Sequence, residues 1–82
     1  MKPIKVYSTS YCSFCDAAKR LLTRLQIKFE DINLDGKDEL RSRLTEENNG
    51  YRTVPMIFVG DEFIGGYNEL KARADAGELR SQ

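Results

Sequence analysis

The fold is decided by residues 4–32, which read IKVYSTSYCSFCDAAKRLLTRLQIKFEDI. Residues 4–7 alternate apolar and polar side chains, which predicts a short strand. From Ser13 the apolar residues recur every three or four positions as far as Leu25, as on one face of a helix. Residues 27–32 return to a mostly alternating pattern. A strand, a helix and a strand joined by such short connections predict a βαβ unit with two parallel strands.

The rest of the chain adds a helix, a hairpin and a last helix to this unit. Gly, Asn and Asp residues separate the segments, as turn residues do. Gly77 follows the last apolar position and predicts the C-terminal end of the final helix. The result is one α/β domain over residues 1–82 with the order β-α-β-α-β-β-α. The expected segments are a helix from the turn at 35–38 to 48–50, strands at 54–59 and from 63–64, and a helix at 67–76.

The length and charge of the chain exclude several classes of protein function. A chain of 82 residues has room for one small domain. Its 13 Lys and Arg residues balance its 13 Asp and Glu residues, which argues against a general nucleic-acid or membrane-surface binder. No apolar run approaches the roughly 20 residues of a membrane span, and the N-terminus lacks the apolar stretch of a signal peptide. We therefore expect a cytoplasmic protein.

The chain contains two cysteines and no histidine. One chain therefore cannot build a zinc site from four Cys and His ligands, nor a nucleophile activated by histidine. Two cysteines are also too few for a disulfide framework. What remains is their spacing, Cys12-Ser13-Phe14-Cys15, at the start of a predicted helix.

This spacing predicts thiol–disulfide exchange. Residues three apart lie on one face of a helix, so the two sulfur atoms can reach bonding distance. Cys12 faces the helix N-terminus, where free N–H groups favour an anion, so we expect a lowered thiol pKa and a nucleophilic role. Cys15, one turn inside, is expected to be more buried and to act as the resolving thiol. The alternatives are two structural core cysteines, or half of a metal cluster shared by two chains.

Three motifs together resemble the glutaredoxin family over nearly the whole chain. They are Cys12-Ser13-Phe14-Cys15, Thr53-Val54-Pro55 and Gly65-Gly66-Tyr67-Asn68. Thioredoxins resemble the chain less, because they usually carry tryptophan before the first cysteine, where this chain has Tyr11. The glutaredoxin resemblance implies a thioredoxin-like fold, with a four-stranded mixed sheet flanked by three helices.

The resemblance also implies a glutathione site. Pro55 is expected to follow a cis peptide bond, which leaves the Val54 backbone to pair with the cysteinyl part of glutathione, as in strand addition. The last helix begins at Tyr67, and its N–H groups would hold the γ-glutamyl carboxylate. Asn68 stands where many members have an aspartate that meets the ligand's ammonium group. The residues implied to bind glutathione are Phe14, Arg52, Thr53, Val54, Pro55, Gly66, Tyr67 and Asn68.

The chain departs from the common family pattern at three positions. Ser13 replaces a proline, and members without that proline more readily hold a 2Fe–2S cluster between two chains through the first cysteine and glutathione. Thr9 stands where the family commonly has a lysine that helps stabilise the thiolate. Either Arg52 or Lys19 supplies the positive charge instead, or the stabilisation of the thiolate is weaker. Asp16 stands where a basic residue is more usual. Its carboxylate would oppose thiol ionisation, but it also lies in the first helical turn, where an acidic side chain favours the helix.

The resulting hypothesis is a glutathione-dependent oxidoreductase that reduces protein–glutathione mixed disulfides and protein disulfides. Glutathione is the cosubstrate, and the chain is expected to be a monomer unless it shares a 2Fe–2S cluster. Two alternatives stay open: a cluster-binding protein, and a small thioredoxin-like electron carrier with a donor other than glutathione. The expected partners are glutathione and proteins that are glutathionylated or contain disulfides, with no nucleic acid and no membrane.

Overall fold

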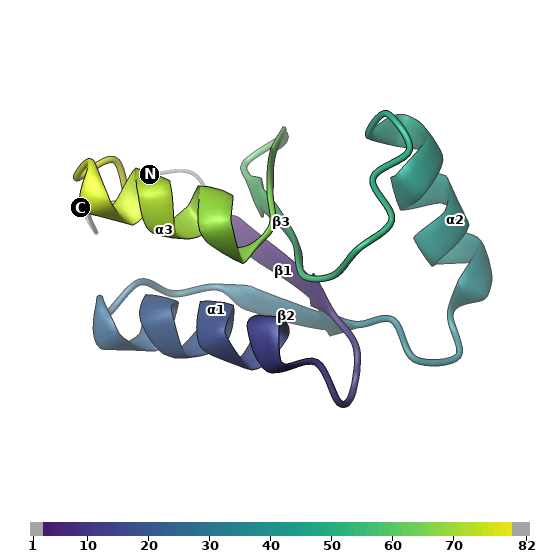
Figure 1. Cartoon of the computed structure of the whole chain (residues 1–82), viewed down its shortest axis with the longest axis horizontal. Helices are drawn as coiled ribbons and strands as arrows, with labels where there is room; N and C mark the ends of the chain where they lie inside the picture. Colours follow the sequence, from purple (N-terminus) through teal and green to yellow (C-terminus); the bar gives the residue numbers. More distant parts are fainter. Residues whose placement is uncertain (1–2, 80–82) are drawn as a thin grey trace.

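The computed structural model describes residues 3–79, which form one four-stranded sheet and three helices (Figure 1). The strand order is β2-β1-β3-β4. β1 runs parallel to β2 and antiparallel to β3, and β3 pairs antiparallel with β4. The predicted mixed sheet and the predicted order of elements are therefore both confirmed. The elements are β1 (Ile4–Ser8), α1 (Ser13–Arg24), β2 (Glu30–Asn33), α2 (Asp38–Glu47), β3 (Met56–Val59), β4 (Glu62–Gly65) and α3 (Tyr67–Asp75).

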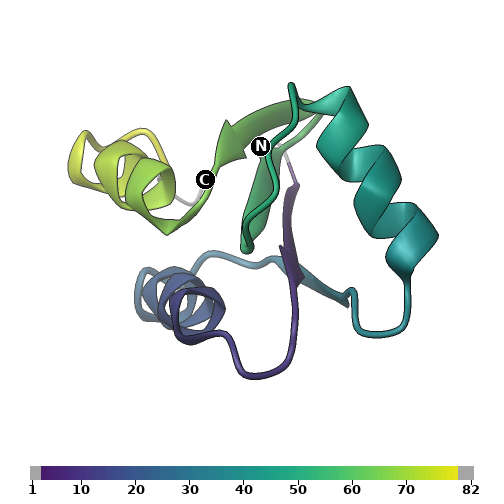
Figure 2. The same ribbon diagram turned by 45° about the vertical axis from the view of Figure 1, so that its right-hand side comes forward.

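The helices cover the two faces of the sheet unequally. α1 and α3 lie together on one face and α2 lies on the other (Figure 2). Side chains of each strand alternate between the faces, so neighbouring residues enter different cores. Ile57 packs in the core under α1 and α3, whereas Met56 packs in the smaller core under α2. The first core is the larger one and comprises Ile4, Val6, Ala18, Leu22, Ile27, Ile57, Ile64, Leu70 and Leu79.

β2 starts later than the sequence pattern predicts, at Glu30 rather than residue 27. The N–H of Ile27 donates to the carbonyl of Leu22, and the N–H of Gln26 donates to that of Thr23. Gln26 has a φ of 59°, so these bonds form the left-handed turn that ends many helices. Ile27 is buried in the larger core all the same. Its apolar side chain therefore signals burial, while its backbone completes α1.

β3 also starts later than predicted, at Met56 rather than Val54. Pro55 has no N–H and cannot donate to a strand ladder, which explains why regular pairing begins after it. The last helix matches its prediction closely. It ends at Asp75, and Gly77 follows with a φ of 76°. No helix in residues 3–79 has the length and apolar character needed to cross a membrane.

A polar contact ties α1 to the sheet at β1 and β2. The hydroxyl of buried Ser8 donates to the Asp31 carboxylate at 2.7 Å, and Lys19 Nζ lies 3.0 Å from the same carboxylate. Burial raises the pKa of Asp31, but the Ser8 hydroxyl and Lys19 outweigh it, and the net direction is downward. The folded state therefore favours the ionised form of the Asp31 carboxylate.

Acidification should weaken the fold partly through Asp31. Because its pKa is lower in the folded state, its contribution is present above the unfolded pKa and is lost as the pH falls through the folded pKa. The carboxylate is partly exposed, so we expect a contribution of about 0.5–1 kcal/mol. Urea unfolding of wild type and Asp31→Asn at pH 6, 4 and 3 would measure it.

The difference in unfolding free energy between the two proteins should shrink as the pH falls. Asp61→Asn is the matched control, because Asp61 is an exposed aspartate in the turn between β3 and β4. A constant difference between wild type and Asp31→Asn across this pH range would contradict the assignment.

Candidate active site

Cys12 caps the N-terminus of α1 through its sulfur atom. Cys12 has an extended backbone, and its carbonyl accepts the first helical hydrogen bond from the N–H of Asp16 at 3.1 Å. The N–H of Cys15 donates to Cys12 Sγ, also at 3.1 Å. The sulfur thus takes the place of the serine or aspartate oxygen that usually accepts this bond. Negative charge on that sulfur would be stabilised by the helix N-terminus.

The two cysteines differ sharply in access to solvent. They form a disulfide with their Cα atoms 5.2 Å apart. Cys15 is completely buried in the first turn of α1, whereas Cys12 is only half-buried. A thiol or disulfide in solution can therefore reach the sulfur of Cys12 but not that of Cys15. This contrast in burial agrees with the prediction from the spacing.

The loop before Cys12 is held against the segment that follows β2. The backbone N–H and the hydroxyl of Ser10 both donate to the Asp35 carboxylate. The N–H of Asp35 donates to the Asn33 side chain at 2.7 Å. The hydroxyl of Ser10, followed by its N–H, lowers the pKa of Asp35. Tyr11 lies between Ser10, which makes these hydrogen bonds, and Cys12. It has a φ of 58° and a fully exposed side chain.

A cavity of about 220 Å³ lies next to Cys12, between the segment before β3 and the start of α3. Cys12 Sγ lies 3.7 Å from the carbonyl oxygen of Val54, which lines this cavity. The Val54–Pro55 peptide bond is cis, as predicted, and Pro55 is buried. Two of the lining residues, Tyr51 and Glu69, were not anticipated from the sequence. The lining residues are Phe14, Tyr51, Thr53, Val54, Pro55, Gly66, Tyr67, Asn68 and Glu69.

Phe14 belongs to the rim of this cavity rather than to the core. Its side chain is 59% exposed, although its position continues the apolar stripe of α1. Its ring centroid lies 6.2 Å from that of Tyr67 at the start of α3. The two rings form an aromatic wall beside the disulfide, which is the location that the family resemblance implied.

The carboxylate of Glu69, a residue of α3 itself, lies at the N-terminus of this helix. Gly66 is the N-cap residue, and its N–H donates to Glu69 Oε1 at 2.7 Å. Glu69 is the one ionisable acid or base among the described residues lining the cavity, apart from two tyrosines. A glutamate three residues after the N-cap is a known helix-start pattern, so Gly66-Tyr67-Asn68-Glu69 could have revealed this contact. The N–H groups of the next residues remain at the helix start.

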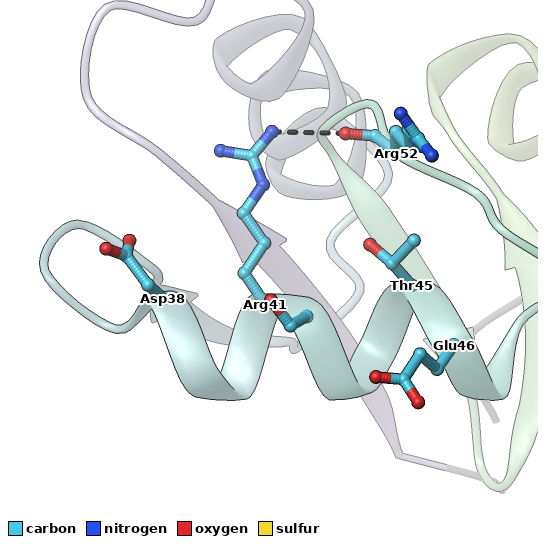
Figure 3. A pocket seen from close by; sticks show the side chains of 6 residues that line it. Asp38, Arg41, Thr45, Glu46 and Arg52 are labelled. Carbon is cyan, nitrogen blue, oxygen red and sulfur yellow. Dashed lines mark hydrogen bonds between the residues drawn. The ribbon is translucent and has the colours of Figure 1, made fainter.

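Arg52 lies outside this cavity. It lines a wider groove of about 550 Å³ along α2, with Asp38, Arg41, Ser42, Thr45 and Glu46. Figure 3 shows Arg41 reaching from α2 to the backbone of Arg52, whose carbonyl accepts from Arg41 Nη2 at 3.1 Å. We assign the active site to the smaller cavity, because its lining residue Val54 has its carbonyl oxygen 3.7 Å from Cys12 Sγ.

The other basic residue considered for the site is Lys19. It forms an ion pair with Asp31 at 3.0 Å and does not line the cavity. Asp16 is exposed in the first turn of α1, where water can solvate its carboxylate. Because no Lys or Arg of the described residues lines the cavity, the sulfur of Cys12 relies on the helix N–H groups for its local stabilisation.

Comparisons with known proteins agree on one family. The family model described as glutaredoxin matches residues 4–64. A Pseudomonas aeruginosa protein named glutaredoxin is 42% identical over 79 residues, which cover 96% of this chain and 93% of that protein. Rice glutaredoxin-C6 is also 42% identical, over 94% of this chain and 70% of its own length.

Solved structures show the same architecture. A crystal structure titled as a buckwheat glutaredoxin–glutathione complex matches with a TM-score of 0.87 and 32% identity, covering 95% of this chain and 73% of that one. A wheat glutaredoxin crystal structure matches with a TM-score of 0.86 and 40% identity, covering 94% and 74%. The fold is therefore thioredoxin-like.

Proposed function

Because the chain belongs to the glutaredoxin family, whose members are thiol–disulfide oxidoreductases, we propose that it uses glutathione to reduce protein–glutathione mixed disulfides and protein disulfides. One observation carries the proposal: the accessible sulfur of Cys12 lies 3.7 Å from the Val54 carbonyl at the edge of a cavity. That cavity opens beside the reacting sulfur and ends at the N-terminus of a helix, where a carboxylate binds favourably.

Glutathione would lie extended along this cavity. Its cysteinyl backbone would pair with that of Val54, and Thr53 and Pro55 would shape the edge on which it lies. The γ-glutamyl carboxylate would meet the helix start at Gly66, Tyr67 and Asn68. Phe14 and Tyr67 would shield the sulfur end of the tripeptide, and Arg52 would attract its net negative charge from the groove along α2.

The proposed reaction with a glutathionylated protein uses Cys12 alone. The Cys12 thiolate attacks the glutathione sulfur, the bond to the protein sulfur breaks, and the protein thiolate leaves and takes a proton. Cys12 is then bonded to glutathione. A second glutathione thiolate attacks the bound glutathione sulfur, which releases oxidised glutathione and restores the Cys12 thiolate.

A protein disulfide requires both cysteines. The Cys12 thiolate attacks one substrate sulfur and forms a mixed disulfide, and the first substrate thiol leaves. The Cys15 thiolate then attacks Cys12 Sγ, which releases the second substrate thiol and leaves the Cys12–Cys15 disulfide. Two glutathione molecules reduce this disulfide in turn, and the first attacks Cys12 because Cys15 is fully buried.

Turnover of a glutathionylated peptide tests the proposal. The reduced 82-residue protein is assayed with glutathione, glutathione reductase and NADPH, and NADPH consumption is followed at 340 nm. We expect turnover that saturates with peptide and that disappears when glutathione is omitted. A folded, fully reduced protein without turnover would overturn the proposal.

Two predictions made from the sequence remain as alternatives. A thioredoxin-like carrier would accept electrons from a flavoprotein reductase in the absence of glutathione, so the same assay with that donor separates it. A 2Fe–2S protein would use Cys12 and glutathione from each of two chains. It would show visible absorbance and a dimeric mass that both depend on glutathione.

A further inference from the structure

The hydroxyl of Tyr51 lies at the start of α3, inside the candidate active site. Tyr51 precedes the Thr53-Val54-Pro55 segment and lines the cavity. A Cβ atom placed on Gly66 would come within 2.6 Å of the Tyr51 hydroxyl oxygen. The hydroxyl therefore rests over the N-cap residue of α3, where only a glycine leaves it room.

The ring of Tyr51 is fixed by its surroundings. It meets Phe63 edge-on, with the ring centroids 4.9 Å apart and the planes at 74°. The ring packs against the core under α2, which contains Leu34, Leu44 and Met56. The backbone N–H of Tyr51 donates to the Asn48 carbonyl at 3.2 Å. A ligand that bonds to this hydroxyl would therefore not need to order the side chain first.

The Tyr51 hydroxyl has no hydrogen-bond partner among residues 3–79. The nearby N–H of Gly66 is already taken by Glu69. The helix start thus offers the next backbone N–H groups together with one free phenol hydroxyl. An oxygen anion placed there could accept from both kinds of donor, and such bonds to a charged acceptor are stronger than neutral ones.

We propose that Tyr51 donates a hydrogen bond to the γ-glutamyl α-carboxylate of glutathione and makes the site selective for ligands that carry this group. The inference rests on the proposed function, because it assigns a residue to the glutathione end of the same cavity. The Glu69 carboxylate lies near the same point of the helix start but already accepts from the Gly66 N–H, so the Tyr51 hydroxyl is the side-chain donor there that is free for a ligand.

The test compares Tyr51→Phe with wild type on two peptide mixed disulfides. One carries glutathione, and the other carries an analogue with 4-aminobutyrate in place of the γ-glutamyl residue, which has no α-carboxylate. Loss of one hydrogen bond to a charged group should raise KM for the glutathione substrate about tenfold, with kcat nearly unchanged. KM for the analogue should be the same for both proteins.

Tyr7→Phe is the matched control. Tyr7 packs in the same core and meets Phe58 edge-on at 5.6 Å, but it does not line the cavity. Tyr7→Phe should have the same KM as wild type for both the glutathione substrate and the analogue. Thermal unfolding of both variants checks that each still folds, which the retained phenyl rings favour. If Tyr51→Phe were unfolded, Tyr51→His, which keeps a ring and a donor, would be compared with wild type on the same two substrates.

The outcomes separate the inference from the function on which it rests. An unchanged KM in Tyr51→Phe, with an active wild type, would overturn the role of Tyr51 and leave the proposed function standing. Equal losses on both substrates would assign Tyr51 a structural role and also overturn the inference. A wild type inactive on both substrates would overturn the proposed function and the inference with it.

Discussion

Replacing Cys12 with serine is expected to reduce turnover of both substrate classes by roughly 10³-fold or more, because the attacking thiolate is lost. Cys15 cannot take over, since its side chain is completely buried behind Cys12 in α1. Serine keeps an oxygen that can accept the Cys15 N–H at the helix start, so folding should be retained. The glutathione-coupled assay with a glutathionylated peptide and a disulfide-bonded peptide measures the loss.

Removing Cys15 should separate the two reactions. Deglutathionylation needs only Cys12, so Cys15→Ala should keep it to within a few-fold. Reduction of a protein disulfide should fall much further, because a stable mixed disulfide with Cys12 then accumulates and can be seen by mass spectrometry. Alanine is preferred to serine here, because an unpartnered hydroxyl in a fully buried position would destabilise the fold.

Two results would contradict these roles. Full activity of Cys12→Ser would show that Cys12 is not the nucleophile. Equal loss of both reactions in Cys15→Ala, with unfolding unchanged, would show that Cys15 does more than resolve mixed disulfides. The matched comparison is Ala18→Ser, which adds a hydroxyl at another fully buried position of α1 without touching a cysteine and so reports the effect of core perturbation alone.

Sequence periodicity predicted the order of the elements because each buries one side of a regular repeat. It failed at two strand starts, and both failures have a backbone cause. Ile27 is apolar and buried, yet its N–H completes the end of α1 and is not free for a strand. Val54 continues an apolar run, but the following proline cannot donate to a ladder. An apolar pattern predicts which side chains are buried, whereas strand pairing also depends on which acceptor each backbone N–H bonds to.

The lining of the candidate site could be predicted to a similar degree, whereas the binding of glutathione there stays a prediction. Of the eight residues that the family resemblance assigned to glutathione, seven line the cavity and Arg52 does not. Tyr51 was missed because its meaning depends on Gly66, which is far away in the sequence and brought to it by the sheet. Such a contact leaves no periodic signal. Glu69, by contrast, could have been found from its spacing to the N-cap of the helix.

The same helix start places a strict demand on Gly65. Its φ is 117°, a conformation that side-chain-bearing residues rarely adopt, and it is buried at the end of β4. A Cβ atom there would lie 2.7 Å from both Cγ and Oε1 of Glu69. Those atoms are held in place by the hydrogen bond from Gly66 to the Glu69 carboxylate. An alanine would therefore suffer both backbone strain and a steric clash.

We expect Gly65→Ala to lower the unfolding free energy by about 2–3 kcal/mol. In a domain of this size that corresponds to a fall in Tm of roughly 10 °C or more. The variant should also raise KM for the glutathionylated peptide, because the Glu69 side chain must turn away and give up its hydrogen bond with the Gly66 N–H at the edge of the cavity. Urea unfolding and the coupled assay measure the two effects.

A double-variant comparison isolates the clash from the strain. Gly36→Ala is the matched control for strain, because Gly36 has a φ of 74° and a Cβ there would meet nothing within 4 Å. It should destabilise the protein less than Gly65→Ala and leave KM unchanged. Adding Glu69→Ala to Gly65→Ala removes the clashing side chain, so the double variant should lose less stability than the two single losses combined. Additive losses would show that Glu69 does not restrict position 65, and that the backbone conformation alone makes glycine necessary there.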